Sequence, residues 1–239
     1  MRRVLILQAG SADPAVRARF GDYPDWFARL LAPRVGLRVI RPYQEKIPPL
    51  APFHGVLMTG SSHSVTTPEP WMDEAATYML DAARTRPVLG VCFGHQLLAR
   101  ALGGRVERNP WGREAGTVEV QLTEAGAQDA LFAGAPTTFP VQETHEDHVP
   151  GLPQGAMLLA RNDSAPVQAY GVGESIRCVQ FHPEMDAARS RLVNELRRDL
   201  LDAKTPGGAR AVLASIRATP ISERVLTNWV ERFVGASPP

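Results

Sequence analysis

The chain has 239 residues, of which 44% are hydrophobic and 21% charged, and its formal net charge is +1. This composition argues against a disordered or fibrous protein and is sufficient for one sizeable α/β core. The arginines are scattered among acidic residues, so no basic footprint for nucleic acid is expected. No apolar run approaches the length of a membrane span, and the short apolar start after Met1 does not resemble a signal segment. We therefore expect neither nucleic acid nor membrane as a partner.

Only two cysteines are present, Cys92 and Cys178. Two cysteines provide no disulfide framework, which favours a reducing, cytoplasmic setting in which thiols stay free. Cys178 lies inside an alternating apolar stretch and is expected to be a small buried core residue. Cys92 is therefore the thiol available for chemistry.

The first hundred residues alternate short apolar runs with helix-like spacing, the pattern of βαβ units around a parallel sheet. The expected strands cover 4–8, 37–40, 55–59 and 88–92. The expected helices cover 25–31 and 70–84, and prolines introduce the second of them. A doubly wound α/β fold follows from this order.

Beyond Gly104 the apolar runs become shorter and are separated by turn-forming residues, which indicates an antiparallel elaboration of the sheet. The strands expected there cover 117–122, 138–141, 157–160, 167–170 and 177–181. Helical spacing returns over 187–201, 209–217 and 221–234, after a break at Thr205-Pro206-Gly207-Gly208. We expect one domain over residues 1–205 and a C-terminal helical extension, residues 206–239, packed on that domain.

The segment Gly90-Val91-Cys92-Phe93-Gly94 has the spacing of a nucleophile elbow, in which a strand turns sharply into a helix and presents a nucleophile at the turn. The flanking glycines permit the close approach of strand and helix. A helix N-terminus favours thiolate over thiol, and the backbone N–H after the nucleophile can face a developing oxyanion. Cys92 is therefore the candidate nucleophile.

A thiolate that attacks an acyl group needs a base and a group that orients the base. His182 follows an apolar strand pattern, and Glu184 stands two residues later, beyond Pro183. Proline restricts the backbone between the two side chains, so the imidazole and the carboxylate can be held in a fixed relation. The sequence thus offers a Cys-His-Glu set.

Gly90-Val91-Cys92-Phe93-Gly94-His95-Gln96 together with Phe181-His182-Pro183-Glu184 resembles the class I (triad) glutamine amidotransferases, and more narrowly stand-alone proteins similar to the glutaminase domain of GMP synthase. The resemblance runs from about Val4 to Leu201. It implies a three-layer, flavodoxin-like α/β/α fold with a mostly parallel central sheet. It also implies hydrolysis of the glutamine side-chain amide through a γ-glutamyl thioester.

The resemblance assigns roles residue by residue. Cys92 is the implied nucleophile, His182 the general base and acid, and Glu184 the orienting carboxylate. Met58-Thr59-Gly60-Ser61-Ser62 resembles the family's glycine loop, so the backbone of Gly60 and the N–H of Phe93 are expected to form the oxyanion hole. The substrate-binding residues implied by the resemblance are Gln96, Ser61, Thr144 and His145.

Two further segments fit the family pattern. Gln142-Glu143-Thr144-His145-Glu146-Asp147-His148-Val149 resembles a Ser-His-Gly-Asp-x-Val segment that lines the glutamine pocket, with Thr144 in place of Ser and Glu146 in place of Gly. Trp111-Gly112-Arg113-Glu114-Ala115-Gly116 fits the Glu-Ile-Gly turn, with Ala115 in place of Ile. His145 and His148 also have ligand-like spacing, but no further set of ligands accompanies them, so we expect no metal.

Three functions remain open. The first is a glutaminase that delivers ammonia to a synthetase on a separate chain, since nothing after Leu201 is long enough for an ATP-dependent synthetase domain. The second is a γ-glutamyl peptide or amine hydrolase that uses the same triad, because the triad does not select the leaving group. The third is a non-catalytic binding or regulatory protein on this fold. No motif calls for a cofactor.

Overall fold

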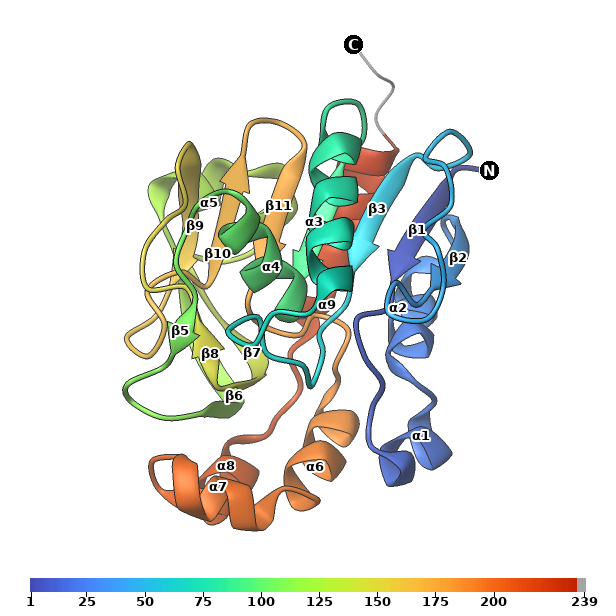
Figure 1. Ribbon diagram of the computed structural model, residues 1–239. Coiled ribbons are helices and arrows are strands. Elements are labelled where there is room, and N and C mark those ends of the chain that lie inside the picture. The colour runs from blue at the N-terminus through green and yellow to red at the C-terminus, as the bar shows by residue number, and fades with distance from the viewer. Residues whose placement is uncertain (236–239) are drawn as a thin grey trace.

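A computed structural model of the protein describes residues 1–235 and contains a nine-stranded sheet in the order β2-β1-β3-β4-β11-β10-β9-β6-β7 (Figure 1). Its first five strands run parallel: β2 (Gly36–Ile40), β1 (Arg3–Leu7), β3 (Gly55–Met58), β4 (Val88–Val91) and β11 (Ile176–Val179). In chain order these strands are arranged 2-1-3-4-5, which is the flavodoxin-like order. The predicted α/β fold class is confirmed.

The remaining four strands extend the sheet in antiparallel fashion, as predicted for most of the region after Gly104. The strand expected over 177–181 is the exception, because it forms β11 and pairs parallel with β4. They are β10 (Ala169–Val172), β9 (Ala156–Arg161), β6 (Glu114–Leu122) and β7 (Thr138–His145). β6 and β7 are longer than the sequence indicated, because their polar ends at Glu114 and His145 continue the ladder. A separate two-stranded antiparallel sheet pairs β5 (Glu107–Arg108) with β8 (Asp147–His148).

Alternation along β1 divides the core between the two faces of the sheet. Val4 and Ile6 belong to one buried cluster and Leu5 and Leu7 to the other, because successive side chains of a strand point to opposite faces. The first face is covered by α2 (Tyr23–Leu31) and α9 (Pro220–Trp229), and the second by α3 (Pro70–Ala83) and α4 (Phe93–Ala101). The result is a three-layer α/β/α arrangement.

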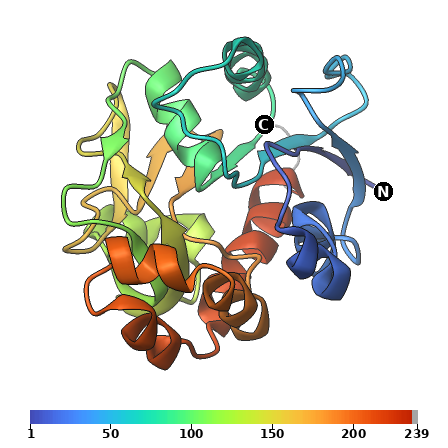
Figure 2. The same cartoon turned by 60° about the horizontal axis from the view of Figure 1, so that its bottom comes forward.

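Short helices complete the fold: α1 (Pro14–Phe20), α5 (Glu124–Gln128), η1 (Ala130–Phe132), α6 (Ala187–Glu195), α7 (Arg198–Lys204), α8 (Gly208–Ser215) and a π-helical turn, η2 (Val230–Val234). The sequence analysis missed α1, although Asp13 caps its first turn and Pro14 begins it. α6, α7 and α8 gather below the sheet, beyond the carboxyl ends of the parallel strands (Figures 1 and 2).

The single helix expected over 187–201 is wrong. It is interrupted between Glu195 and Arg198, where Arg197 has φ −113° and ψ 21° and leaves the helical conformation. The chain turns there because α6 and α7 both pack around α8 rather than along one axis. This turn places Arg197 at the carboxyl edge of the sheet, which matters for the site described below.

The segment after residue 205 contributes directly to the core. Leu226, Trp229 and Val230 lie in the same buried cluster as Val4 and Ile6 of β1. The proposed division into residues 1–205 and 206–239 stays a prediction, and residues 236–239 of that extension lie outside the described residues. Within residues 1–235, no helix is both long enough and apolar enough to cross a membrane.

The Trp229→Ala substitution tests whether the extension is part of the core. Trp229 is fully buried against the sheet, so its truncation is expected to lower the free energy of unfolding by about 3–5 kcal/mol. The matched control is Trp111→Ala, because Trp111 is 62% exposed and its loss is expected to change stability by about 0.5 kcal/mol or less. Chemical denaturation measures both values, and similar small losses would show that residues 206–235 dock only loosely.

Candidate active site

Cys92 occupies a sharp turn between β4 and α4. Its backbone has φ 51° and ψ −99°, and it is the only non-glycine residue with positive φ among residues 1–235. A Cβ added at Gly90 would lie 2.6 Å from the carbonyl oxygen of Gly94, and one added at Gly94 would lie 2.8 Å from that of Met58. Both neighbours therefore have to be glycine for this turn to form, and the predicted strand-turn-helix geometry is present.

His182 and Glu184 follow β11, the strand beside β4. The Nδ1 atom of His182 lies 2.7 Å from Oε1 of Glu184, and the two residues are only 5% and 1% exposed. Gly60 follows β3, on the other side of β4, where an added Cβ would lie 2.8 Å from Cε1 of His182 and 3.5 Å from Cβ of Cys92. Three adjacent parallel strands thus deliver Gly60, Cys92 and His182 to one place.

The electrostatic surroundings of His182 favour its protonated form. Burial alone lowers the pKa of His182, but the charge of Glu184, the charge of Cys92 and hydrogen bonds to both side chains raise the pKa well above its usual value. The Nε2 atom of His182 is buried and has no other partner among the described residues. The imidazole is therefore fixed through Nδ1, and its other nitrogen stays available for proton exchange.

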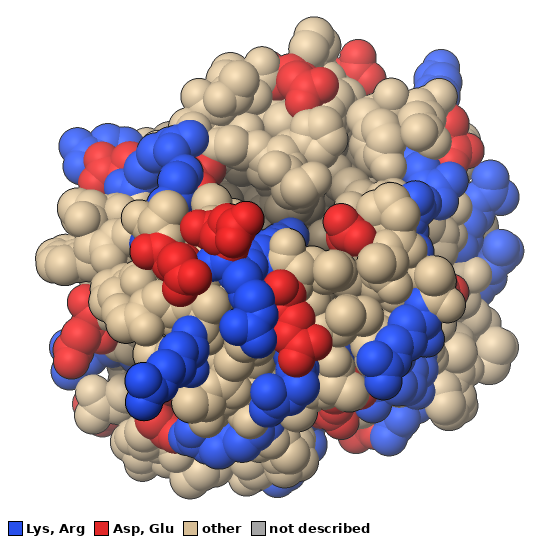
Figure 3. Space-filling model, turned by 90° about the horizontal axis from the view of Figure 1, so that it is seen from below, with Lys and Arg blue, Asp and Glu red and all other residues tan. Residues whose placement is uncertain are grey.

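A pocket of about 330 Å³ opens beside Cys92, a volume at the small end of the range for small-molecule sites. It lies at the carboxyl edge of the sheet, on the face where Figure 3 shows basic and acidic side chains interspersed around a hollow. The predicted residues Ser61, Phe93, Gln96, Thr144 and His145 all line it. The other lining residues are Ser62, His63, Ser64, Cys92, Arg108, Arg113, Glu146, Asp147, Arg197 and Leu200.

The predicted binding residues make several contacts within the protein. The Ser61 hydroxyl donates to the carbonyl oxygen of Ala9 at 2.8 Å. The Gln96 amide nitrogen donates to the Asp147 carbonyl oxygen at 2.8 Å and to Oε1 of Gln180 at 3.1 Å. The pocket thus brings these side chains to the thiol, while their roles toward substrate stay predictions.

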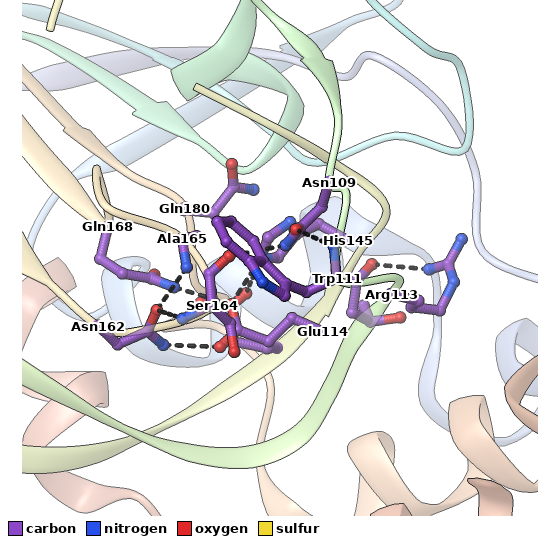
Figure 4. A network of polar contacts seen from close by, with 12 residues as sticks. Asn109, Trp111, Arg113, Glu114, His145, Asn162, Ser164, Ala165, Gln168 and Gln180 are labelled. Carbon is purple, nitrogen blue, oxygen red and sulfur yellow. Dashed lines mark hydrogen bonds and ion pairs between the residues drawn. The ribbon is translucent and has the colours of Figure 1, made fainter. Parts of the chain in front are cut away.

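A buried network of hydrogen bonds holds the His145 side chain. Its Nδ1 atom lies 2.8 Å from the Asp147 carbonyl oxygen, and its Nε2 atom lies 2.8 Å from Oε2 of Glu114. Glu114 also accepts hydrogen bonds from Asn162 and Gln168, at 2.6 and 2.9 Å (Figure 4). Both ring nitrogens of His145 therefore face acceptors, and both carboxylate oxygens of Glu114 receive amide hydrogens.

His145 and His148 have ligand-like spacing in the sequence, but in the structure they do not belong to one cluster of potential metal ligands. His148 lies 3.7 Å from Glu107 instead, whereas His145 lies within 4.8 Å of ligand atoms of both Glu114 and Glu143. The atoms of His145 and Glu114 that would bind an ion already make hydrogen bonds with each other. Burial, together with the negative charge of Glu114, raises the pKa of Glu143 well above its usual value, which favours a neutral acid.

Among the pocket residues that the sequence did not single out as binding residues are Arg113 and Arg197. Arg113 belongs to the segment that resembles the Glu-Ile-Gly turn, but the sequence does not indicate that its side chain lines the pocket. Arg197 lies at the break between α6 and α7, within a stretch that the sequence presents as one helix. No local signal identifies Arg197, because only the packing of these helices directs it into the pocket.

The chain matches the family described as "Glutamine amidotransferase class-I" over residues 29–194, well over half of its length. It belongs to that family, whose general chemistry is glutamine hydrolysis. Arg197 lies beyond the matched residues.

Individual relatives differ in how much of each protein is shared. The chain is 36% identical over 173 residues to a protein named GMP synthase [glutamine-hydrolyzing] from Aeropyrum pernix, covering 69% of this chain but 32% of that protein. It is 27% identical over 215 residues to a protein named Gamma-glutamyl peptidase 4 from Arabidopsis thaliana, covering 87% and 82%. The chain thus spans about a third of the first relative and most of the second.

A solved structure has the same fold over nearly the whole chain. The crystal structure of a glutamine amidotransferase from Thermotoga maritima superposes with a TM-score of 0.78 at 22% identity, covering 98% of this chain and 99% of that one. At this identity the similarity establishes the architecture alone.

The Glu184→Gln variant tests the electrostatic support of His182. Loss of the carboxylate removes the largest influence that raises the pKa of His182, while burial continues to lower it, so the pKa is expected to fall. NMR titration of the His182 ring measures this pKa directly. The control is Glu195→Gln, at an exposed position of α6.

The same titration has a consequence for stability. A histidine whose pKa is raised by folding stabilises the protein fully below its unfolded value of about 6.5, and this stabilisation is lost as pH rises through the folded value. Glu184→Gln should weaken that dependence of the unfolding free energy on pH. An unchanged His182 pKa in the variant would contradict the role given to Glu184.

Proposed function

We propose that the protein hydrolyses the side-chain amide of glutamine through a thioester on Cys92. The Cys92 thiolate attacks the γ-carbonyl carbon, and the resulting oxyanion accepts hydrogen bonds from the backbone N–H groups of Phe93 and Gly60. His182 transfers a proton to the leaving nitrogen, the C–N bond breaks and ammonia departs. His182 then accepts a proton from water, the hydroxide attacks the thioester, and glutamate and the Cys92 thiol are released.

One observation carries this proposal: a strained cysteine at the end of β4 stands beside a His182-Glu184 pair at the end of β11. A buried carboxylate that accepts from Nδ1 fixes the tautomer and orientation of a catalytic imidazole, which leaves Nε2 to exchange protons with the nucleophile. The N–H of Phe93 belongs to the first turn of α4 and has no partner inside the helix. It is thus available to an oxyanion.

The proposed substrate contacts are those that line the pocket next to the thiol, namely Ser61, Gln96, Thr144 and His145. Gln96 and His145 both contact the Asp147 carbonyl oxygen, so both would help to position this side of the substrate pocket. We propose that ammonia passes to a synthetase on a separate chain. The partial coverage of GMP synthase supports this, because the chain matches only 32% of that protein's length.

A γ-glutamyl peptide or amine hydrolase is the second candidate. The observation that favours it is the similarity to Gamma-glutamyl peptidase 4 along most of both chains. The chemistry is unchanged, because only the amine that departs from the thioester differs. A binding protein without catalysis is less well supported, because the elbow cysteine and the His182-Glu184 pair are both in place.

Release of ammonia and glutamate from glutamine tests the proposal, with γ-glutamyl peptides assayed in parallel. Cys92→Ala is expected to reduce turnover by about 10⁴-fold or more, since the thioester can no longer form. Cys178→Ala is the matched control, because Cys178 is a buried thiol away from the pocket and its loss should leave turnover intact.

The pattern of substrates distinguishes the three functions. Turnover of glutamine that depends on Cys92 supports the glutaminase, and turnover of peptides alone supports the second candidate. Activity that survives in Cys92→Ala would exclude the thioester mechanism for both. A wild-type protein that neither turns over these compounds nor reacts with glutamine-like alkylating agents would be a binding protein.

A further inference from the structure

A second cavity, the amino-edge cavity, has a volume of about 880 Å³ and lies at the edge of the sheet opposite the Cys92 pocket. The parallel strands β1, β3, β4 and β11 begin beside it, because it is lined by the residues that immediately precede them, Arg2, His54, Pro87 and Ser175. In Figure 1 this is the upper edge of the sheet, whereas α6, α7 and α8 lie below the lower one. The volume is in the range of small-molecule sites, and the Cys92 chemistry gives the cavity no role.

The amino-edge cavity is strongly basic. The arginines that line it are Arg2, Arg84, Arg86, Arg177 and Arg232. Among the described lining residues only Glu174 is acidic, and it is exposed. With His54 neutral, five cations and one anion give these residues a formal net charge of +4, although the whole chain has a net charge of only +1. Positive charge is therefore concentrated at this cavity.

Two of these arginines are fixed by carbonyl groups rather than by carboxylates. Arg2 donates from Nη1 to the Val234 carbonyl oxygen. Arg86 donates from Nε to the Phe53 carbonyl oxygen at 3.0 Å. Among residues 1–235, neither arginine has a carboxylate oxygen within 4.0 Å, and neither uses its Nη2 atom in a hydrogen bond. Both guanidinium groups are thus held in place while their charge and their Nη2 donors stay available to a ligand.

Arg177 is the most buried of the five arginines, with 8% of its surface exposed. Its Nε atom donates to Asp129 at 2.8 Å, and its Nη1 atom donates to the carbonyl oxygens of Gly173 and Ile176. Its guanidinium carbon lies 5.0 Å from the centre of the Phe233 ring, which also lines the cavity. Within residues 1–235 its Nη2 atom makes no hydrogen bond, so this fixed side chain also keeps a donor for a ligand.

The two exposed arginines add charge that the protein hardly compensates. Arg84 lies 3.4 Å from Asp81, but both side chains are mostly exposed, and such pairs contribute little. Arg232 has no carboxylate oxygen within 4.0 Å in the described part of the chain. Like charges that line one cavity repel each other and attract anions to it. One carboxylate would neutralise only one of these charges, whereas a diphosphate group carries several negative charges and many acceptor oxygens.

Part of the cavity wall is apolar. The residues that form this part are Ala83, Pro87, Ala130 and Phe233. The Phe233 ring is partly exposed, and the Arg177 guanidinium lies over it, so an apolar surface directly adjoins the basic one. Inorganic phosphate would leave this surface uncovered, whereas a ring attached to the anionic group would cover it.

We propose that the amino-edge cavity binds a small molecule that carries a diphosphate group next to a ring. Arg86, Arg177 and Arg232 donate to the phosphate oxygens, because guanidinium groups match phosphate geometry and form strong charge-assisted hydrogen bonds. The ring lies against Phe233. This site is at the opposite edge of the sheet from Cys92, so its existence does not depend on the thioester chemistry.

Isothermal titration calorimetry of the full chain at low ionic strength tests the proposal with three probes: ADP, inorganic diphosphate and adenosine. ADP is expected to bind most tightly, inorganic diphosphate more weakly because it lacks the ring, and adenosine most weakly because it lacks the charge. The affinity for ADP and for diphosphate should fall as salt is added, since salt screens the arginine charges.

Three variants locate the binding. Arg86→Gln is expected to weaken ADP binding by about 10-fold or more, the range for a charge-assisted hydrogen bond. Arg232→Gln should weaken it by about threefold or more, and this exposed side chain has no ion pair within residues 1–235 whose loss would disturb the fold. The matched control is Arg197→Gln, which makes the same charge change in the pocket beside Cys92 and should leave ADP binding unchanged.

The other outcomes overturn the proposal or a stated part of it. If neither ADP nor diphosphate binds the wild type at low ionic strength, the cavity is not an anion site. Equal losses in Arg86→Gln, Arg232→Gln and Arg197→Gln would show a general effect of charge, and a loss confined to Arg197→Gln would place ADP beside Cys92. Equal affinities for ADP and diphosphate would overturn the contact between the ring and Phe233.

Discussion

The positive φ of Cys92 is the constraint on which the site depends. A non-glycine residue in this conformation is strained, and it persists only where its surroundings determine it fully. Here Gly90 and Gly94 allow β4 and α4 to approach until no side chain fits between them. Packing of α4 on the sheet, reinforced by the Trp71 ring stacked on Phe93, holds the turn in place. The strain therefore fixes the thiol at the edge of the sheet rather than burying it among the strands.

Parallel pairing supplies the rest of the catalytic geometry. Because β3, β4 and β11 are neighbours and run in the same direction, the segments that follow them meet at one edge. Gly60, Cys92 and His182 come from positions far apart in the chain, yet their distances are set by strand spacing and register. Glu184 then favours the protonated form of His182, because its charge raises the pKa of an imidazole whose burial lowers it.

The opposite wall of the pocket is built by the antiparallel strands. Glu114 on β6 and His145 on β7 are register partners, and the amides of Asn162 and Gln168 complete the hydrogen bonds of that carboxylate. This buried network supports Thr144 and Asp147, which face the pocket. The break between α6 and α7 places Arg197 at the same pocket. Elements outside the parallel sheet therefore contribute to the charge of the pocket.

The amino-acid sequence by itself determined the α/β class, the first four parallel strands, and the elbow at Cys92, but it assigned the parallel strand β11 to the antiparallel part. These features are local: apolar runs of strand length, glycines around one cysteine, and a proline between His182 and Glu184 each act within a few residues. The sequence also identified Gln96 and His145, but not their protein partners. Only the tertiary structure decided that Arg197 leaves the helix and meets Arg113, and that Glu143 is buried beside Glu114. The physical reason is that charge, burial and unused hydrogen-bond donors depend on which distant elements pack together, and no local pattern encodes that.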